Sequence, residues 1–278
     1  MRRNGVSATR CKQNLIEDWC QLNMRSPLVL FVVLVSLCVA SSAAHGADST
    51  RLRDDGSRRL FDLANQERVR IGLAPLKWDN ALASAAERHA ERMAANGSLS
   101  HQYPGEPDLA ERFSAEGARF SAVAENVAFS GTADSIHDQW MHSPGHRANI
   151  LDPNMTELGV AVVRVNGRAY AVEDFARGVE NLSLGEQERR VERMVAARGL
   201  VIAPYKEEAR RICDGGRAAK GERQPRFTMR YTTHDLSLLP NQLAAAAGSG
   251  RYHDATIGAC DSDDAGSFSS YHLVVLMF

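Results

Sequence analysis

The sequence lacks an excess of charge of either sign, and it has only one long hydrophobic run. Its 33 Lys and Arg residues and 34 Asp and Glu residues give a formal net charge of −1. The chain therefore has no general electrostatic attraction for nucleic acid, and no nucleic-acid partner is expected. A single apolar run excludes a multi-span membrane protein. Hydrophobic residues make up 44% of the chain, which excludes disorder as its main state.

Several catalytic signatures are also absent. The sequence contains no GxSxG nucleophile elbow, no GxxxxGK[ST] phosphate loop, no GxGxxG and no HExxH. Each of these motifs places a nucleophile, a phosphate or a zinc ion at a defined backbone position. Their absence removes the support for serine hydrolases and nucleotide-dependent enzymes of those families.

The one apolar run predicts export. Residues 28–40 read LVLFVVLVSLCVA and carry no charge. A membrane-spanning helix needs about 20 apolar residues, whereas this shorter run, followed by small residues, is typical of a signal peptide. We expect cleavage after Gly46 or Ala44, so residues 1–46 are a signal peptide, with Met24 as an alternative start. The mature chain is then secreted or extracytoplasmic, without a stable membrane span. An uncleaved N-terminal anchor is the alternative.

Few cysteines remain after the predicted cleavage. The chain has five, of which only Cys213 and Cys260 lie beyond the predicted signal peptide. Two cysteines in an oxidising compartment predict one disulfide bond. A pair of buried free thiols is the alternative.

The segment after the signal peptide begins with a polar stretch and two predicted helices. Residues 47–57 are polar and are expected to form a linker, and a helix follows over 58–71. Asp79 is expected to cap a second helix that ends before Gly97. His89 lies on the apolar face of this helix, so we interpret it as a hydrogen-bonded core histidine.

The remaining pattern up to residue 178 predicts a mixed α/β unit. Ser143 and Pro144 are typical of a helix start, and Asn166-Gly167 is typical of a hairpin turn. The expected helices cover 107–116, 133–142 and 144–151, and the expected strands cover 158–165 and 169–175.

Residues 179–278 predict a smaller C-terminal α/β segment without a motif that carries chemistry. The expected helices cover 185–198 and 204–213, and the expected strands cover 227–233, 256–259 and 271–278. RIGLAPLKWDNALA in the first part faintly resembles ARGLVIAPYKEEA in the second, but the likeness is too weak to establish a repeat.

Polar side chains capable of chemistry gather at loops and helix ends before residue 178. They are His101, Glu125, His142 and His146. Two imidazoles and a carboxylate can bind a divalent metal with an open coordination position, or they can form a general acid/base pair. Spacing alone does not bring these residues together, because they are distant in sequence.

Four segments together resemble the CAP superfamily, which comprises the cysteine-rich secretory, antigen 5 and pathogenesis-related proteins. They are NQERVRIGLAPLKWDNALASAAERHAERMAANGSLSH, AENVAFSG, QWMHSPGHRANILDPNMTELGVAV and YAVEDFA. The match is to the bacterial SCP-like branch and covers a domain over residues 58–178. The C-terminal segment, 179–278, lies outside it. The resemblance implies an α+β fold, with helices on both sides of a central sheet in an α-β-α sandwich.

The resemblance also implies a cleft lined by two histidines and two acids. His101, Glu125 and His146 match three of these positions, while the second acid is replaced by Ser143. The three residues are thus candidate binding residues and candidate ligands of one divalent cation, zinc, magnesium or calcium. Asp138, His142 and Glu157 are the candidates for the missing ligand. The alternative is a hydrogen-bonded network that only stabilises the fold, with Asn65, Arg68, Asn126 and Asn149 fixing loops and caps.

Fold does not settle function, and three hypotheses remain. The first is an exported protein that binds a lipid, a cell-envelope component or a protein partner through the CAP cleft or surface. The second is a metal-assisted hydrolase of peptides or cell-wall material, in which Glu125 is the candidate catalytic residue. The third is a structural or adhesion protein that interacts through residues 179–278.

Overall fold

The computed structural model describes residues 46–217, 223–261 and 267–278. The predicted signal peptide lies almost entirely outside these residues. Among the helices of the described ranges, none is long and apolar enough to cross a membrane.

The first part of the chain forms a four-stranded sheet with the strand order β1-β3-β4-β2. Strand β1 is parallel to β3, and the other neighbours are antiparallel. The predicted hairpin turn is confirmed, because Asn166 and Gly167 both have positive φ angles, 51° and 75°, as a tight turn of this type requires. The strands are β1 (Lys77–Trp78), β2 (Phe120–Ser130), β3 (Glu157–Val165) and β4 (Arg168–Gly178).

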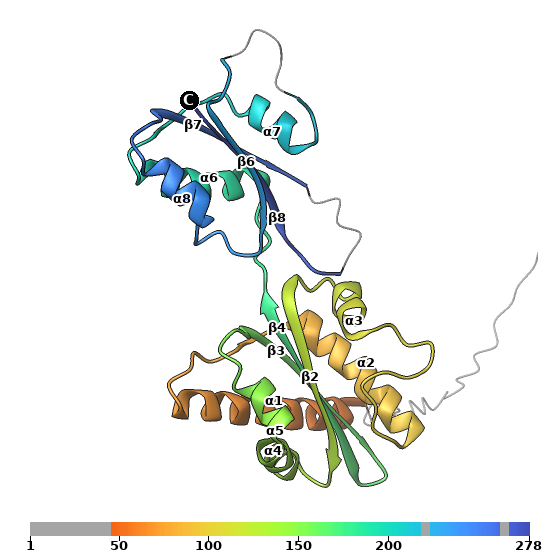
Figure 1. The fold of residues 1–278 in the computed structure, drawn as a ribbon. Helices are drawn as coiled ribbons and strands as arrows, with labels where there is room; N and C mark the ends of the chain where they lie inside the picture. Colours follow the sequence, from red (N-terminus) through yellow and green to blue (C-terminus); the bar gives the residue numbers. More distant parts are fainter. Residues whose placement is uncertain (1–45, 218–222, 262–266) are drawn as a thin grey trace, which may run out of the picture. The chain divides into compact units, whose positions relative to one another are not determined.

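Helices cover both faces of this sheet, which confirms the predicted α-β-α sandwich (Figure 1). Even-numbered residues of β3, such as Leu158 and Val160, pack against α1, α4 and α5. Odd-numbered residues, such as Ala161 and Val163, pack against α2, because successive strand side chains point to opposite faces. The helices are α1 (Gly46–Arg70), α2 (Asn80–Asn96), α3 (Leu109–Ala115), α4 (Ala133–His142) and α5 (Pro144–Ile150).

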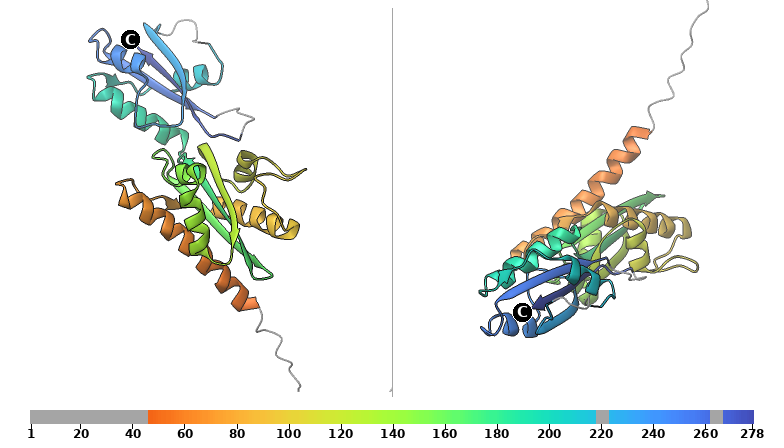
Figure 2. Two further views of the ribbon diagram at one scale, coloured as in Figure 1. Left: turned by 60° about the horizontal axis from the view of Figure 1, so that its bottom comes forward. Right: turned by 90° about the horizontal axis from the view of Figure 1, so that it is seen from above.

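The expected linker at 47–57 is wrong. Helix α1 begins at Gly46 and runs without a break to Arg70 (Figure 2). Gly56 and Ser57 are buried, and a Cβ at Gly56 would touch Val162. Because Gly56 lets the helix approach β3 closely, the helix continues through a stretch whose composition is typical of a linker.

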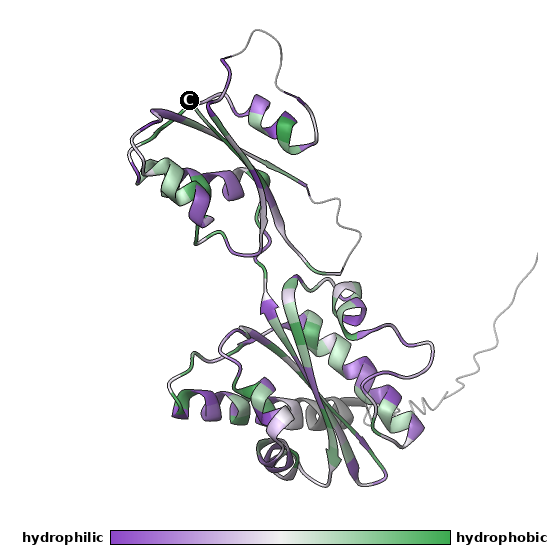
Figure 3. Ribbon diagram, viewed as in Figure 1, coloured by the Kyte–Doolittle hydropathy of each residue, from purple (hydrophilic) through white to green (hydrophobic). Residues whose placement is uncertain are grey.

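Residues 179–278 form a second four-stranded sheet with the order β5-β7-β8-β6. Its helices pack on it through their own apolar residues: α6 and α8 contribute to one core cluster and α7 to another. Figure 3 shows hydrophobic segments along the strands of both sheets. The elements are α6 (Leu184–Ala196), β5 (Val201–Ile202), α7 (Glu207–Cys213), β6 (Phe227–Thr233), α8 (Asn241–Ala247), β7 (Asp254–Cys260) and β8 (Tyr271–Met277).

The predicted disulfide bond is confirmed, and one helix was missed. Cys213 and Cys260 are bonded, with their Cα atoms 5.6 Å apart, within the usual range for a disulfide. The bond joins the end of α7 to the end of β7. Helix α8 was not expected from the sequence, although its run of alanines favours a helix.

Gly159 on β3 allows the close packing of α2 on the sheet. A Cβ at this position would overlap with the backbone of Leu82 and Ala83 in α2. We predict that Gly159→Ala lowers the free energy of unfolding by about 1–3 kcal/mol, because a well-packed backbone cannot move aside. Denaturant unfolding measures the change.

Gly131→Ala is the matched control. Gly131 is exposed, and among the described residues no atom lies within 4 Å of the point that a Cβ would occupy there. We expect a change within about 0.5 kcal/mol. Equal stability of the two variants would contradict the close contact at Gly159.

Candidate functional site

Strand β2, at the edge of the first sheet, places the central carboxylate of the site. Glu125 lies in the middle of β2 and points to the face that α2 covers, as its neighbour Val127 does. Helix α2 ends at Asn96, and Gly97 follows with a φ angle of 64°. That left-handed residue terminates the helix, and the chain then turns back so that His101 reaches Glu125.

His101 and Glu125, two of the three predicted site residues, are in direct contact. His101 Nδ1 donates to Glu125 Oε1 at 2.7 Å. The side chain of His101 is 61% exposed, whereas that of Glu125 is 3% exposed. The hydrogen bond to Glu125 raises the pKa of His101 above its ordinary value, although burial opposes the shift. The histidine thus presents a solvent-accessible ring on a buried carboxylate.

A buried arginine that the sequence did not single out binds the other oxygen of this carboxylate. Arg112 Nη2 donates to Glu125 Oε2, and Arg112 Nη1 donates to the carbonyl of His101 at 3.0 Å. Helix α3 positions the arginine and begins with a capping box between Asp108 and Glu111. Because the two side chains are both almost fully buried, the guanidinium balances a charge that water cannot reach.

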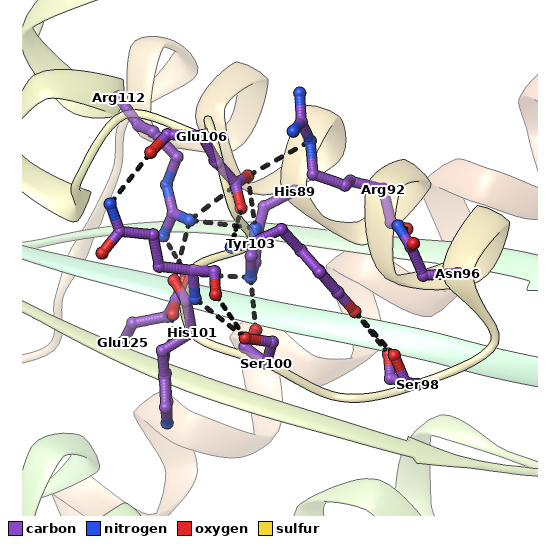
Figure 4. A network of polar contacts seen from close by, with 11 residues as sticks. His89, Arg92, Asn96, Ser98, Ser100, His101, Tyr103, Glu106, Arg112 and Glu125 are labelled. Atoms are coloured by element: carbon purple, nitrogen blue, oxygen red, sulfur yellow. Dashed lines mark hydrogen bonds and ion pairs between the residues drawn. The ribbon is translucent and has the colours of Figure 1, made fainter.

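His89 belongs to the same network of polar contacts (Figure 4). Its Nε2 donates to the carbonyl of Ser100 at 2.7 Å, and its Nδ1 lies 2.8 Å from Glu106 Oε1. Burial alone would raise the pKa of Glu106, but hydrogen bonds from His89 and from the Tyr103 backbone lower it. The prediction that His89 is a hydrogen-bonded core residue is confirmed.

Asp174 is the second acid beside Glu125, and sequence reasoning missed it. It pairs directly with Glu125 across β4 and β2, and cross-strand neighbours lie on the same face of a sheet. Neither carboxylate oxygen has a hydrogen-bonding partner among the described residues. Burial raises the pKa of Asp174 well above its ordinary value, and the charge of Glu125 raises it further. The only signal in the sequence was an acidic pair inside an otherwise apolar strand.

The opposite face of the same two strands carries a second buried polar group. Asn126 Nδ2 donates to Glu173 Oε2 and to the carbonyl of His146, each at 3.1 Å. Asn149 Nδ2 donates to Asn126 Oδ1 at 2.9 Å. Burial raises the pKa of Glu173 to about 8. Asn126 and Asn149 thus fix the segment that carries His146, as predicted.

His146, the third predicted site residue, has no hydrogen bond or ion pair to His101 or Glu125 among the contacts of the described residues, and its backbone carbonyl accepts from Asn126. Its pKa is lowered, first by burial and then by the charge of His101. Pro144 occupies the first turn of α5, as predicted, but Ser143 makes no side-chain capping bond among the described residues. The structure thus brings His101 and Glu125 into contact, whereas His146 is linked to this region through Asn126.

The described residues do not fit the predicted metal ion. Within the described ranges, no group of three or more His, Cys, Asp or Glu side chains is arranged to hold a metal. Both oxygens of Glu125 are already engaged, one by His101 and one by the cationic Arg112. A guanidinium beside the carboxylate repels a divalent cation.

None of the three expected substitutes for the missing acid joins this network. His142 Nδ1 donates to the backbone carbonyl of Asp138 at 2.6 Å. Glu157 lies at the start of β3, beside Gly178. The acid that lies beside Glu125 across the strands is Asp174 of β4.

Comparison with known proteins finds a family model that matches the first part of the chain. Residues 61–175 match the model of the cysteine-rich secretory protein family, CAP. The first sheet and the helices around it are thus similar to the CAP domains of bacterial SCP proteins.

Two of the relatives are uncharacterized proteins of Bacillus subtilis. The chain is 36% identical over 110 residues to the uncharacterized protein YkwD of Bacillus subtilis, covering 38% of this chain and 42% of YkwD. It is 30% identical over 128 residues to the uncharacterized membrane protein YlbC of the same organism, covering 46% of this chain and 36% of YlbC. The chain thus spans less than half the length of either relative.

A solved structure is similar over the same part of the chain. An extracellular protein containing an SCP domain from Bacillus anthracis is 28% identical, with a TM-score of 0.43. The alignment covers 46% of this chain and 42% of that chain.

The buried ion pair at Glu125 gives a direct test of the network. We predict that Arg112→Met lowers the free energy of unfolding by about 3–5 kcal/mol, because it leaves a buried carboxylate without its counter-charge. Arg59→Met is the control: Arg59 pairs with Asp134 where both side chains are about half exposed, and such pairs contribute about 0–1 kcal/mol. Chemical denaturation compares the two, and equal losses would contradict the role of Arg112.

Glu173 predicts a pH dependence of stability. Its pKa is about 8 in the folded state and near 4.5 when unfolded, so the folded state binds more protons between these values. The stabilisation is therefore complete below pH 4.5, falls as pH rises, and is lost above about pH 8. We predict that Glu173→Gln, which can still accept the bond from Asn126, shows a smaller loss between pH 5 and 8.

Unfolding by denaturant at both pH values measures this difference. Glu180→Gln is the control, since Glu180 is 64% exposed. A parent-like pH dependence of Glu173→Gln would show that Glu173 does not titrate in this window.

Proposed function

We propose that the protein is an exported binding protein that holds a cell-envelope component at the surface formed by His101 and His146. A lipid or a protein partner is the alternative ligand. The observation that carries the proposal is that both carboxylate oxygens of Glu125 already have a partner, one in His101 and the other in Arg112. The chemistry left for a ligand is then the outer edge of the two imidazole rings.

The exposed ring of His101 and the backbone of the half-buried His146 are held by groups that a ligand does not reach. The 61% exposed side chain of His101 rests on Glu125, and the backbone of His146 is held by Asn126. Rigid support of this kind lowers the entropy that is lost on binding. His101 Nδ1 is engaged by Glu125, so its Nε2 is the nitrogen left for a ligand. An imidazole nitrogen forms hydrogen bonds with hydroxyl and amide groups, so the pair suits a polar ligand such as a polysaccharide or a peptide.

The hydrolase hypothesis has less support. Asp174 is the acid beside Glu125, but it is completely buried and cannot touch a substrate. The metal that would activate water does not fit the described residues, because Arg112 occupies the carboxylate that would bind it. A catalytic general base also needs hydrogen-bonding reach to its substrate, and Glu125 is covered by His101.

Cosedimentation tests the proposal. We predict that the mature protein sediments with purified cell-wall sacculi, and that His101→Ala/His146→Ala reduces the bound fraction at least tenfold. Vesicles of phosphatidylglycerol test the lipid alternative in parallel. His253→Ala is the matched control, because His253 is exposed and belongs to the second sheet's part of the chain. We expect it to bind like the parent.

Three outcomes separate the hypotheses. Binding by the double variant equal to that of the parent would exclude this surface. Binding to vesicles instead of sacculi would replace the proposed ligand by a lipid. Soluble fragments released from the sacculi by the parent, and not by the double variant, would establish the hydrolase.

A further inference from the structure

The second sheet repeats the first in strand order, direction and connection. The orders β1-β3-β4-β2 and β5-β7-β8-β6 match position by position. In each sheet, the short first strand is parallel to its neighbour and the other pairs are antiparallel. The helices also alternate with the strands in the same order once the short helices α3 and α5 are set aside. The folds of 58–178 and 179–278 thus have one topology.

We infer that residues 179–278 are a second, shortened copy of the CAP unit that has kept its frame and lost its polar site. The matching topology alone is a weak argument, because small folds recur. Four structural correspondences between the two units support the inference.

The first correspondence is the contact between the second helix and the third strand of each unit. Gly159 on β3 lies against Leu82 and Ala83 of α2, where a Cβ would overlap with the backbone. Gly258 on β7 lies in the same way against Ala209 and Arg210 of α7. Both contacts therefore pair the first turn of the second helix of a unit with a glycine of its third strand, at a place where a Cβ would overlap with the helix backbone.

The second correspondence is the glycine that follows the first helix of each unit. Gly72 follows α1 with a φ angle of 82°, and Gly199 follows α6 with a φ angle of 93°. A leucine comes next in both cases, within the two segments whose sequences faintly resemble each other. The likeness of RIGL and ARGL therefore has a structural cause, since glycine favours this left-handed position.

The third correspondence is the spacing of buried residues along the first helix of each unit. With Gly72 placed on Gly199, three buried residues of α1 fall on three buried residues of α6. The pairs are Leu60 with Gln187, Ala64 with Val191, and Arg68 with Val195.

The fourth correspondence is the set of residues that pair across the strands from the glycine of the third strand. Gly159 pairs with Asp174, which pairs with Glu125. In the second unit Gly258 pairs with Val274, which pairs with Arg230.

These equivalences show what the second unit has lost. Val274 stands at the position of Asp174, and Arg230 at the position of Glu125. The guanidinium of Arg230 donates to the carbonyl of Ile212 near the end of α7, where a cation is favourable. The next pair, Asn126 and Glu173, becomes Tyr231 and Leu273. The acid and amide groups of the first unit are thus replaced at the equivalent places of the second unit.

The disulfide bond provides the sharpest test of these correspondences between the two units. The same equivalences place Cys213 on Ala86 of α2 and Cys260 on Ala161 of β3. Both alanines are buried in one core cluster. If the two units are copies, the disulfide of the second occupies the place of a helix–strand alanine contact in the first.

We therefore expect Ala86→Cys/Ala161→Cys, made in the full chain, to form an additional disulfide under oxidising conditions. Peptide mapping without reduction should show residues 86 and 161 linked, and Cys213 and Cys260 linked as before. Ala86→Cys/Val163→Cys is the control, because it shifts the register along β3 by two residues on the same face. Linkage only in the control, or in neither variant while Cys213 and Cys260 are linked, would overturn the proposal.

A second pair of variants decides the matter if the added cysteines prevent folding. Gly258→Ala should increase amide hydrogen exchange in α7 and β7, as Gly159→Ala should in α2 and β3. Gly131→Ala, with open space around it, should leave exchange unchanged. Parent-like exchange in Gly258→Ala would contradict the equivalence of the two glycines.

Discussion

The fold depends on the approach of a helix onto its sheet closer than any side chain permits. At Gly159 the backbone of α2 lies where a Cβ would stand, and this contact fixes the helix against β3. The position of the helix in turn sets His89 in the core and directs the following loop, with His101, toward the edge strand β2. The equivalent contact at Gly258 persists in the second unit, where the polar residues do not. The packing contact is therefore the constraint that the fold requires.

The polar network adds a charge balance to this frame. Glu125 is buried, and only the cationic Arg112 and the hydrogen bond from His101 make its charge tolerable. Asp174, immediately beside it, has its pKa raised well above the ordinary value by burial and by that same charge. Two carboxyl groups this close disfavour each other's ionised form. The network is thereby stable and closed, and it exposes imidazole rings rather than carboxylates.

Many features of the first unit could be predicted from local pattern. Asp79 caps α2, the Asn166-Gly167 turn closes the hairpin, and Cys213 bonds Cys260. These follow from backbone chemistry over a few residues, or from a count of two cysteines. The linker over 47–57 was wrong because α1 runs without a break from Gly46 to Arg70, with Gly56 and Ser57 buried. Helix α8 was missed because seven residues give too short a periodic pattern.

The sequence by itself indicated a CAP-like first part and the alternation of helices and strands, and it led us to propose His101, Glu125 and His146 as site residues. Only the tertiary structure decided which groups meet. Strand pairing placed Asp174 beside Glu125, and the loop after α2 and helix α3 brought His101 and Arg112 to the same carboxylate. Those contacts join residues far apart in the chain, a separation over which local propensity carries no information. The likeness of the two units was equally hidden, because their shared glycines and buried positions have meaning only when the sheets are seen.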